Sequence, residues 1–153
     1  LHPYVRLMET LARLQRQPLR AFMLAQSTRA AQVDIAGVYK PMLPTASPKR
    51  IAARVHLAFN RYFRPASARP VRVRDEVAEY ELQTLPDDAI EFFRGLNEGF
   101  VRGALMEAGA TKIELSYGPA RAQAPGLVTQ PFHVSFEQLP AGSRSQRGGT
   151  PRS

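Results

Sequence analysis

The side chains that most often do chemistry in proteins are few in this chain and far apart. The three histidines are His2, His56 and His133, and no two of them have the spacing of a helical metal site. The chain has no cysteine, which excludes disulfides, thiolate metal sites and cysteine nucleophiles. We therefore expect no metal site.

Two pairs of acidic residues could supply a general acid and a general base. Asp87 and Asp88 stand where a helix should begin, and Glu79 and Glu81 lie on the same side of a predicted strand. A helix cap and a solvated strand face explain both pairs without catalysis. No serine lies in a nucleophile elbow, and no glycine-rich phosphate loop follows a strand. We therefore assign no catalytic residue and expect a protein that is not an enzyme.

Basic side chains, in contrast, are strongly clustered. Seven arginines fall between residues 50 and 74, with Tyr62 and Phe63 among them. Arginines with interleaved aromatic rings can bind phosphates and stack on bases. The same residues also suit a solvated face or an acidic protein partner. The candidates for a polyanion or partner site are Arg50, Arg54, Arg61, Arg64, Arg69, Arg72 and Arg74.

The net charge of +8 hides an uneven distribution. Residues 1 to 74 hold 14 basic and 2 acidic side chains, whereas residues 75 to 137 hold 4 basic and 11 acidic ones. This asymmetry permits a nucleic acid, another protein or the acidic half of a second copy as a partner for the N-terminal half. It gives no information about the fold.

The clearest element that could position these groups is a helix predicted over residues 89 to 108. Asp88 could cap it, Gly109 could end it, and Glu98 should lie on its solvated side. The helix carries a row of three glycines at four-residue spacing, and each costs about 1 kcal/mol relative to alanine. Such a row lets another helix, a sheet or a flat ligand approach the backbone closely. The glycines are Gly95, Gly99 and Gly103.

Alternation of apolar and polar residues predicts strands around this helix. The strands cover residues 71–73, 77–82, 112–117 and 132–136, with a long loop over 119–131. They form a β-β-α-β-β unit, in which a small antiparallel sheet packs against the long helix. His133 should point away from the core.

The N-terminal part is predicted to be helical. Helices are expected from Pro3, over residues 19–26, and from Pro48 with Ser47 as the cap. Residues 27–46 fit a short strand or an extended arm. The predicted fold class is α+β, with N-terminal helices packed on the β-β-α-β-β antiparallel sheet. One domain is expected over residues 1–137, with a basic helical half at 1–70 and an acidic half at 71–137, followed by a disordered basic tail at 138–153.

Residues 71–137 resemble the 4-vinyl reductase (hydrocarbon-binding) domain. Its relatives include the heme nitric-oxide-binding sensors and small myxobacterial proteins. The resemblance rests on the glycine-rich segment 95–103, on residues 108–110 and on the segment 132–136. Some relatives bind a metal through cysteines near the last strand, which this chain lacks.

The resemblance implies a pocket for an apolar ligand between the glycine-bearing helix, the sheet and the helix from Pro48. In heme-binding relatives a helical histidine ligates iron, which makes His56 a candidate. No local motif around His56 supports heme, so we expect no cofactor. The candidate pocket residues are Phe59, Tyr80, Phe93, Gly95, Gly99, Phe100, Gly103, Leu115 and Phe136.

The sequence therefore predicts a non-enzymatic bacterial module that senses a small apolar molecule or acts as an adaptor. One alternative is an assembly subunit, in which the basic and acidic halves of neighbouring copies meet as a homo-oligomer. Another is a protein that binds nucleic acid without sequence preference. No apolar run approaches the roughly 20 residues of a membrane span, and the absence of cysteine suits a cytoplasmic location.

Overall fold

The computed structural model describes residues 2–37 and 47–138. The chain is α+β, as predicted. Its helices are α1 (His2–Leu14), α2 (Leu19–Gly37), α3 (Pro48–Tyr62) and α4 (Ile90–Glu107), with a short 3-10 helix at Asp87–Ala89. Its strands are β1 (Ser67–Val73), β2 (Val77–Pro86), β3 (Ala110–Tyr117), β4 (Arg121–Ala124) and β5 (Leu127–Gln138). The predicted tail from residue 139 onward lies outside the described residues.

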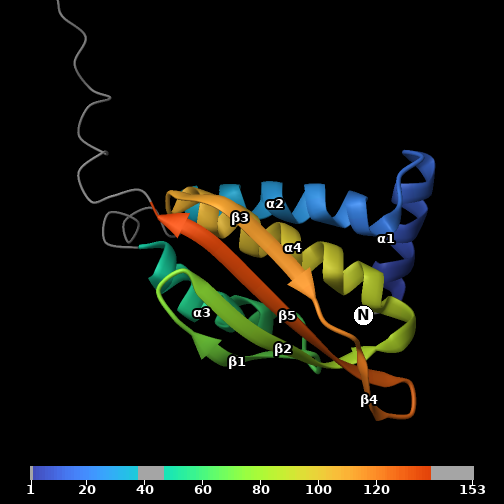
Figure 1. Cartoon of the computed structure of the whole chain (residues 1–153). Helices are drawn as coiled ribbons and strands as arrows, with labels where there is room; N and C mark the ends of the chain where they lie inside the picture. Colours follow the sequence, from blue (N-terminus) through green and yellow to red (C-terminus); the bar gives the residue numbers. More distant parts are fainter. Residues whose placement is uncertain (1, 38–46, 139–153) are drawn as a thin grey trace, which may run out of the picture.

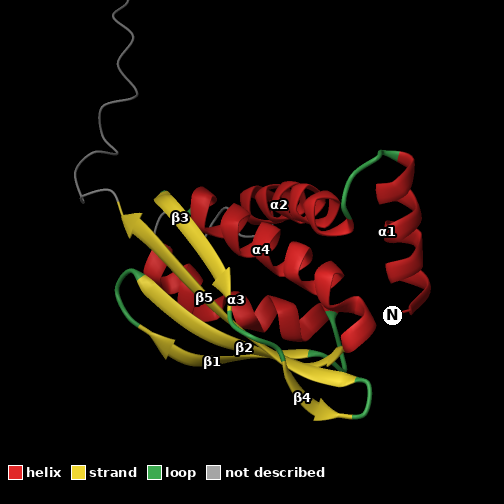
Figure 2. Ribbon diagram, turned by 45° about the vertical axis from the view of Figure 1, so that its right-hand side comes forward, coloured by secondary structure: helices red, strands yellow, loops and turns green. Residues whose placement is uncertain are grey.

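The strands form one antiparallel sheet in the order β1-β2-β5-β3, and β4 pairs with β5 beyond this path. The helices gather on one face of the sheet, with α4 lying between the sheet and α2 (Figures 1 and 2). The prediction of a long loop over residues 119–131 is wrong. Most of it forms a β4–β5 hairpin, and Gly126 in the turn adopts a positive φ of 72°, which glycine permits without strain.

The prediction of a short strand or extended arm after residue 26 is wrong for residues 27–37. Helix α2 continues to Gly37, although Val33 and Ile35 favour strands by propensity. Packing overrides that preference, because Ser27 and Ala31 of α2 are buried against α4. The remaining part of that segment, residues 38–46, lies outside the described residues.

The glycine row of α4 explains this packing. A Cβ atom added to Gly95 would lie 2.4 Å from the carbonyl oxygen of Arg20, and one added to Gly103 would lie 2.7 Å from that of Thr28. The contacts advance in the same direction along both helices, so α2 and α4 run parallel. The backbones approach so closely that a side chain larger than hydrogen does not fit at these positions.

Helix α4 is consequently buried on more than one side. Its partners are α2 on one side and the sheet on the other (Figure 1), so the prediction that Glu98 is solvated is wrong: this residue is only 9% exposed. The predicted cap by Asp88 is also wrong. Asp88 lies within the 3-10 turn, and the residue before α4 is Ala89, which has no capping side chain.

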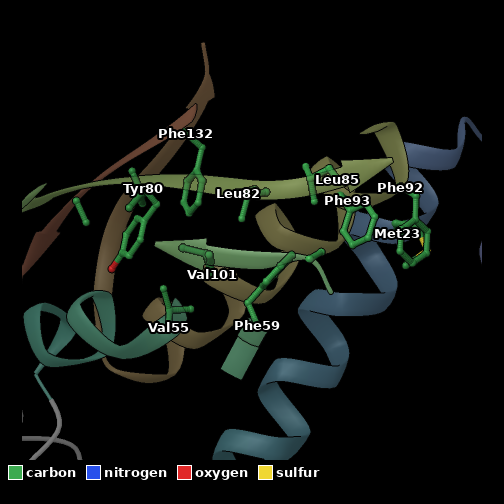
Figure 3. Packing of buried hydrophobic residues seen from close by; sticks show 14 of the residues in the cluster. Met23, Val55, Phe59, Tyr80, Leu82, Leu85, Phe92, Phe93, Val101 and Phe132 are labelled. Atoms are coloured by element: carbon green, nitrogen blue, oxygen red, sulfur yellow. The ribbon is translucent and has the colours of Figure 1, made fainter. Parts of the chain in front are cut away.

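The core fills the space between the sheet, α3 and α4. Tyr80, Leu82 and Leu85 of β2 point from the sheet toward Phe93 of α4 and Phe59 of α3 (Figure 3). The sheet-facing positions follow the predicted alternation, because Phe132, Val134 and Phe136 are all buried whereas His133 is not. No helix in the described part of the chain is long and apolar enough to cross a membrane.

Candidate ligand-binding site

A cavity of about 510 Å³ lies between the four long helices. Its size falls within the range of small-molecule sites in proteins. Helices α1 and α2 form one side, α3 forms the other, and α4 contributes three residues. It is lined by Tyr4, Met8, Leu11, Gln15, Phe22, Met23, Gln26, Ser27, Ala30, Asp34, Val55, Ala58, Phe59, Tyr62, Phe63, Leu96, Asn97 and Phe100.

Most of the lining is aromatic or aliphatic. Phe22, Met23 and Phe59 are almost fully buried, so they mark the inner part of the cavity. Tyr4 and Tyr62 are 47% and 64% exposed, so they mark where the cavity meets solvent. A wall of flat and flexible apolar side chains suits a flat apolar molecule, because ring faces and thioether groups pack well against one another.

Polar side chains occupy two regions of the lining. Gln15, Gln26 and Asp34 are exposed at the rim, whereas Ser27 and Asn97 are each only 5% exposed. Buried polar groups are costly unless they are hydrogen-bonded. The two buried ones can therefore orient a ligand, as the few polar groups of apolar pockets usually do.

Asn97 belongs to a hydrogen-bonded group that joins the cavity to the sheet. Its Nδ2 donates to the hydroxyl oxygen of Tyr117 over 3.3 Å, and the Tyr117 hydroxyl donates to the backbone carbonyl oxygen of Arg94 over 2.9 Å. The pKa of Tyr117 is well above its usual value, first of all because the ring is buried. Its hydroxyl is therefore protonated at any physiological pH.

Charged groups surround the Tyr117 ring. The guanidinium groups of Arg20 and Arg94 lie 5.4 and 5.6 Å from the ring centre, within the range of cation–π contacts. Arg20 also donates to the carboxylate of Glu98 over 3.0 Å, and this bond raises the pKa of Arg20. Arg94 donates to Oε1 of the fully buried Gln130. These contacts fix α2 and α4 to strands β3 and β5.

The structure separates the predicted pocket residues into three groups. Phe59 and Phe100 line the cavity. Four others belong to the apolar core between the helices and the sheet, and the three glycines face α2. Whether any of these residues binds a ligand stays a prediction. The four core residues are Tyr80, Phe93, Leu115 and Phe136, and the glycines are Gly95, Gly99 and Gly103.

Sequence reasoning missed the contribution of the first two helices and of Asn97. The stripe of leucine, methionine and aromatic residues in α1 and α2 was available as a signal, but such a stripe usually indicates core packing. In the structure Phe22 of this stripe is buried in the core, whereas Tyr4 and Met8 line the cavity. Asn97 gave no signal, because its partner Tyr117 comes from a distant strand.

His56 does not line the cavity. Its ring lies 6.2 Å from the ring of Tyr80, on the sheet side of α3. Within the described residues, neither Nδ1 of His56 nor the hydroxyl of Tyr80 has a hydrogen-bond partner, although both atoms are buried. Burial lowers the pKa of His56, with the backbone of Ala53 acting in the opposite direction. The imidazole is therefore neutral near pH 7.

The predicted arginine cluster divides between two surfaces. Arg69 and Arg72 lie on β1, where they form ion pairs with Glu81 and Glu79 of the neighbouring strand. Arg50, Arg54 and Arg61 lie on α3, Arg64 follows it, and Arg74 lies in the β1–β2 turn. Whether these arginines bind a polyanion stays a prediction.

In the part of the chain that the structure describes, no group of three His, Cys, Asp or Glu residues could hold a metal ion.

No protein-family model matches the chain, and no curated protein matches it. Several solved structures do match. One is described as an oxygen-binding H-NOX domain related to soluble guanylate cyclases, in an oxygen complex, and has 11% identity and a TM-score of 0.55. Two others come from work on heme distortion in the H-NOX family and on heme redox potential, each with 13% identity and a TM-score of 0.56. All three matches cover 87% of this chain and 70% of the other chain.

These matches contradict the expectation that the chain takes no cofactor, because the structures that share its fold concern heme and bound oxygen. The cavity's aromatic lining fits the apolar ring of a heme. His56, which the resemblance made a candidate iron ligand, does not fit, because its ring faces Tyr80 and is absent from the lining. At this level of identity the matches establish the architecture, as the resemblance predicted: the chain has the heme-nitric-oxide-binding (H-NOX) type of fold.

Proposed function

We propose that this chain is a non-catalytic sensor domain that binds a flat, largely apolar molecule in the cavity between its helices. The observation that carries the proposal is the aromatic cavity itself. It has a volume of about 510 Å³, and its inner part is lined by the buried side chains of Phe22, Met23 and Phe59, so it suits a flat ring. The fold supports the proposal, because the matched structures include one from work on heme redox potential and one oxygen complex of an H-NOX domain.

Heme is the first molecule to test. Its ring would pack between Phe22 and Met23 of α2 and Phe59 of α3, with its edge near Tyr4 and Tyr62 at the mouth. A bound heme would supply an iron atom that can bind a diatomic gas. The described lining supplies no histidine, so the chain's own contribution is the apolar enclosure of the ring.

Sensing also requires a wall that can respond to the ligand. Helix α2 is held to α4 by backbone contacts at the glycine row, so it is a poor candidate. Helix α1 supplies Tyr4, Met8 and Leu11 to the cavity while Leu7 and Leu14 remain exposed. We therefore assign the responsive wall to α1, whose displacement would disturb the fewest buried contacts.

The experiment uses the full chain, purified without added ligand. Native mass spectrometry should show a bound small molecule, and titration of the stripped protein with heme should give a saturable change in the heme absorption band. Ala58→Trp, which fills the cavity, should abolish both signals. Ala122→Trp on exposed β4 is the matched control and should preserve them. A protein that carries nothing and binds no apolar ring would contradict the proposal.

The assembly hypothesis receives less support. It requires the acidic half to meet the basic half of a second copy, yet Glu79 and Glu81 are already paired within the chain with Arg72, Arg69 and Arg121. Gel filtration at low and high salt would test it. A monomer under both conditions would exclude an assembly that depends on these charges.

A further inference from the structure

The hydrogen-bonded chain at the inner end of the cavity fixes which atoms of Asn97 are available. Tyr117 has one hydroxyl hydrogen, which it donates to the carbonyl oxygen of Arg94. That carbonyl cannot donate, so the hydroxyl oxygen of Tyr117 can only accept from Asn97. The Asn97 amide must therefore turn its nitrogen toward Tyr117, and its Oδ1 must point to the other side.

With Nδ2 turned toward Tyr117, Oδ1 is the acceptor that Asn97 has free for a ligand. Asn97 is 5% exposed and lines the cavity, and among the described residues nothing donates to its Oδ1. Ser27, the other buried polar side chain of the lining, donates its hydroxyl hydrogen to the carbonyl oxygen of Gly95 over 3.3 Å. The oxygens of both side chains are therefore hydrogen-bond acceptors at the inner end.

We propose that Asn97 selects ligands that carry an N–H or O–H donor on the ring edge that enters the cavity first. The inference rests on the proposed function, since it assumes that an apolar ring enters this cavity. A ring with a donor satisfies Oδ1, whereas a ring with an acceptor at the same place leaves two oxygens facing each other without a hydrogen. Sites that hydrogen-bond a polar ligand group discriminate strongly against analogues that lack it.

Tyr117 acts as the positioning residue in this arrangement. It does not line the cavity, but its hydroxyl keeps the amide of Asn97 in one of the two orientations that an amide can adopt. The contacts of Arg20 and Arg94 with its ring keep Tyr117 in place. Removal of the hydroxyl should let the amide rotate, so that either its oxygen or its nitrogen can face the ligand.

Three flat tricyclic compounds of nearly equal shape test the proposal. Carbazole has an N–H donor at the bridging position, dibenzofuran has an oxygen acceptor there, and fluorene has a methylene group. Binding of each to the full chain is measured by fluorescence or calorimetry. Carbazole should bind about tenfold more tightly than dibenzofuran, which corresponds to one net hydrogen bond and one avoided unpaired acceptor.

Variants assign this preference to the named residues. Asn97→Leu should bring the affinities of carbazole and dibenzofuran together, and Tyr117→Phe should reduce their ratio at least threefold while all three compounds still bind. Thr111→Val removes a hydroxyl from the exposed side of the same strand as Tyr117, outside the cavity lining, and is the control, which should keep the wild-type ratio. Should Asn97→Leu fail to fold, Tyr117→Phe decides the question.

The outcomes separate the two proposals. Equal affinity of the wild type for carbazole, dibenzofuran and fluorene would overturn the role of Asn97 and leave the cavity as an apolar ligand site. A preference for carbazole that survives in both Asn97→Leu and Tyr117→Phe would also overturn it. If none of the compounds binds and heme does not bind either, the proposed function fails as well.

Discussion

Gly99 of α4 and Ser27 of α2 are in direct contact: a Cβ atom on Gly99 would lie 2.1 Å from Oγ of Ser27 and 2.3 Å from the carbonyl oxygen of Leu24. Gly99→Ala should therefore destabilise the protein by about 1–3 kcal/mol, because forced separation of two packed helices outweighs the gain in helix propensity of about 1 kcal/mol. Urea unfolding followed by circular dichroism measures the change.

Gly37 provides the matched control for that substitution. It ends α2, and a Cβ atom added there would meet none of the described residues within 4 Å. Gly37→Ala should leave stability unchanged or raise it by about 0.5–1 kcal/mol through the unfolded chain's lower entropy. Equal effects of the two substitutions would contradict the close packing of α2 on α4.

The glycine row also shows how far the sequence could predict this fold. Its spacing predicted a close approach to the backbone of α4, but the identity of the approaching element depended on residues 27–37. Local propensity is ambiguous there, because Val33 and Ile35 favour strands, and the helix is fixed by the contact of Ser27 and Ala31 with α4. The strands were easier to predict, because alternation along residues 77–82 directly reflects one buried face.

The candidate site was harder to predict, since it depends on contacts between distant segments. Helical spacing predicted apolar faces that include Phe59 and Phe100, and both residues line the cavity. The proposed role of Asn97 depends on Tyr117, twenty residues away, and Glu98 is paired with Arg20 of another helix. The neighbour of His56 on the sheet, Tyr80, likewise could not be identified from periodicity. Pattern analysis finds the faces of elements, but not which faces meet.

Glu98 should matter for stability, because its carboxylate lies between two arginines. It accepts from Arg20 over 3.0 Å and from Arg102 over 3.4 Å, and its side chain is 11% exposed. Glu98→Gln should destabilise the protein by about 1–2 kcal/mol, since the amide nitrogen would face guanidinium donors and the partial exposure of the arginines limits the cost.

Glu107→Gln is the matched control for this substitution. Glu107 lies at the last residue of the same helix, and no ion pair is found for it among the described residues. Its replacement should change stability by less than about 0.5 kcal/mol. A loss in Glu107→Gln as large as that in Glu98→Gln would show that charge on α4, and not the contact with Arg20, governs the effect.

The side chain of Asn60 joins α3 to β1, where its amide makes the hydrogen bonds that the backbone of a neighbouring strand would otherwise make. Its Nδ2 donates to the carbonyl oxygen of Ala68 over 3.0 Å, and its Oδ1 accepts from the backbone N–H of the same residue. Asn60→Asp removes the donor and places a negative charge beside a carbonyl oxygen, so we expect a loss of about 1–3 kcal/mol. Thermal unfolding would measure this loss. An unchanged midpoint of thermal unfolding at pH 7 would show that the hydrogen bonds between Asn60 and Ala68 do not stabilise the protein.

His56 should make the protein less stable in mild acid. Burial lowers its pKa in the folded state below the ordinary value of 6.5, so the unfolded chain binds the proton more readily. Above pH 6.5 both states are neutral at this residue, and stability is fully retained. As the pH falls below 6.5, the unfolded state is protonated first, and the free energy of unfolding decreases until the folded-state pKa is reached.

Urea unfolding at pH 7.5, 6.5 and 5.5 tests this expectation in the wild type and in His56→Gln. The wild type should lose stability between pH 6.5 and 5.5, and the variant should lose clearly less, because glutamine does not titrate. The acidic residues whose pKa is lowered, Asp75, Glu79 and Glu81, titrate below this window. His133→Gln, on the outer face of the sheet, is the control for replacing a histidine. An identical decrease in wild type and His56→Gln would show that His56 is not the group that responds.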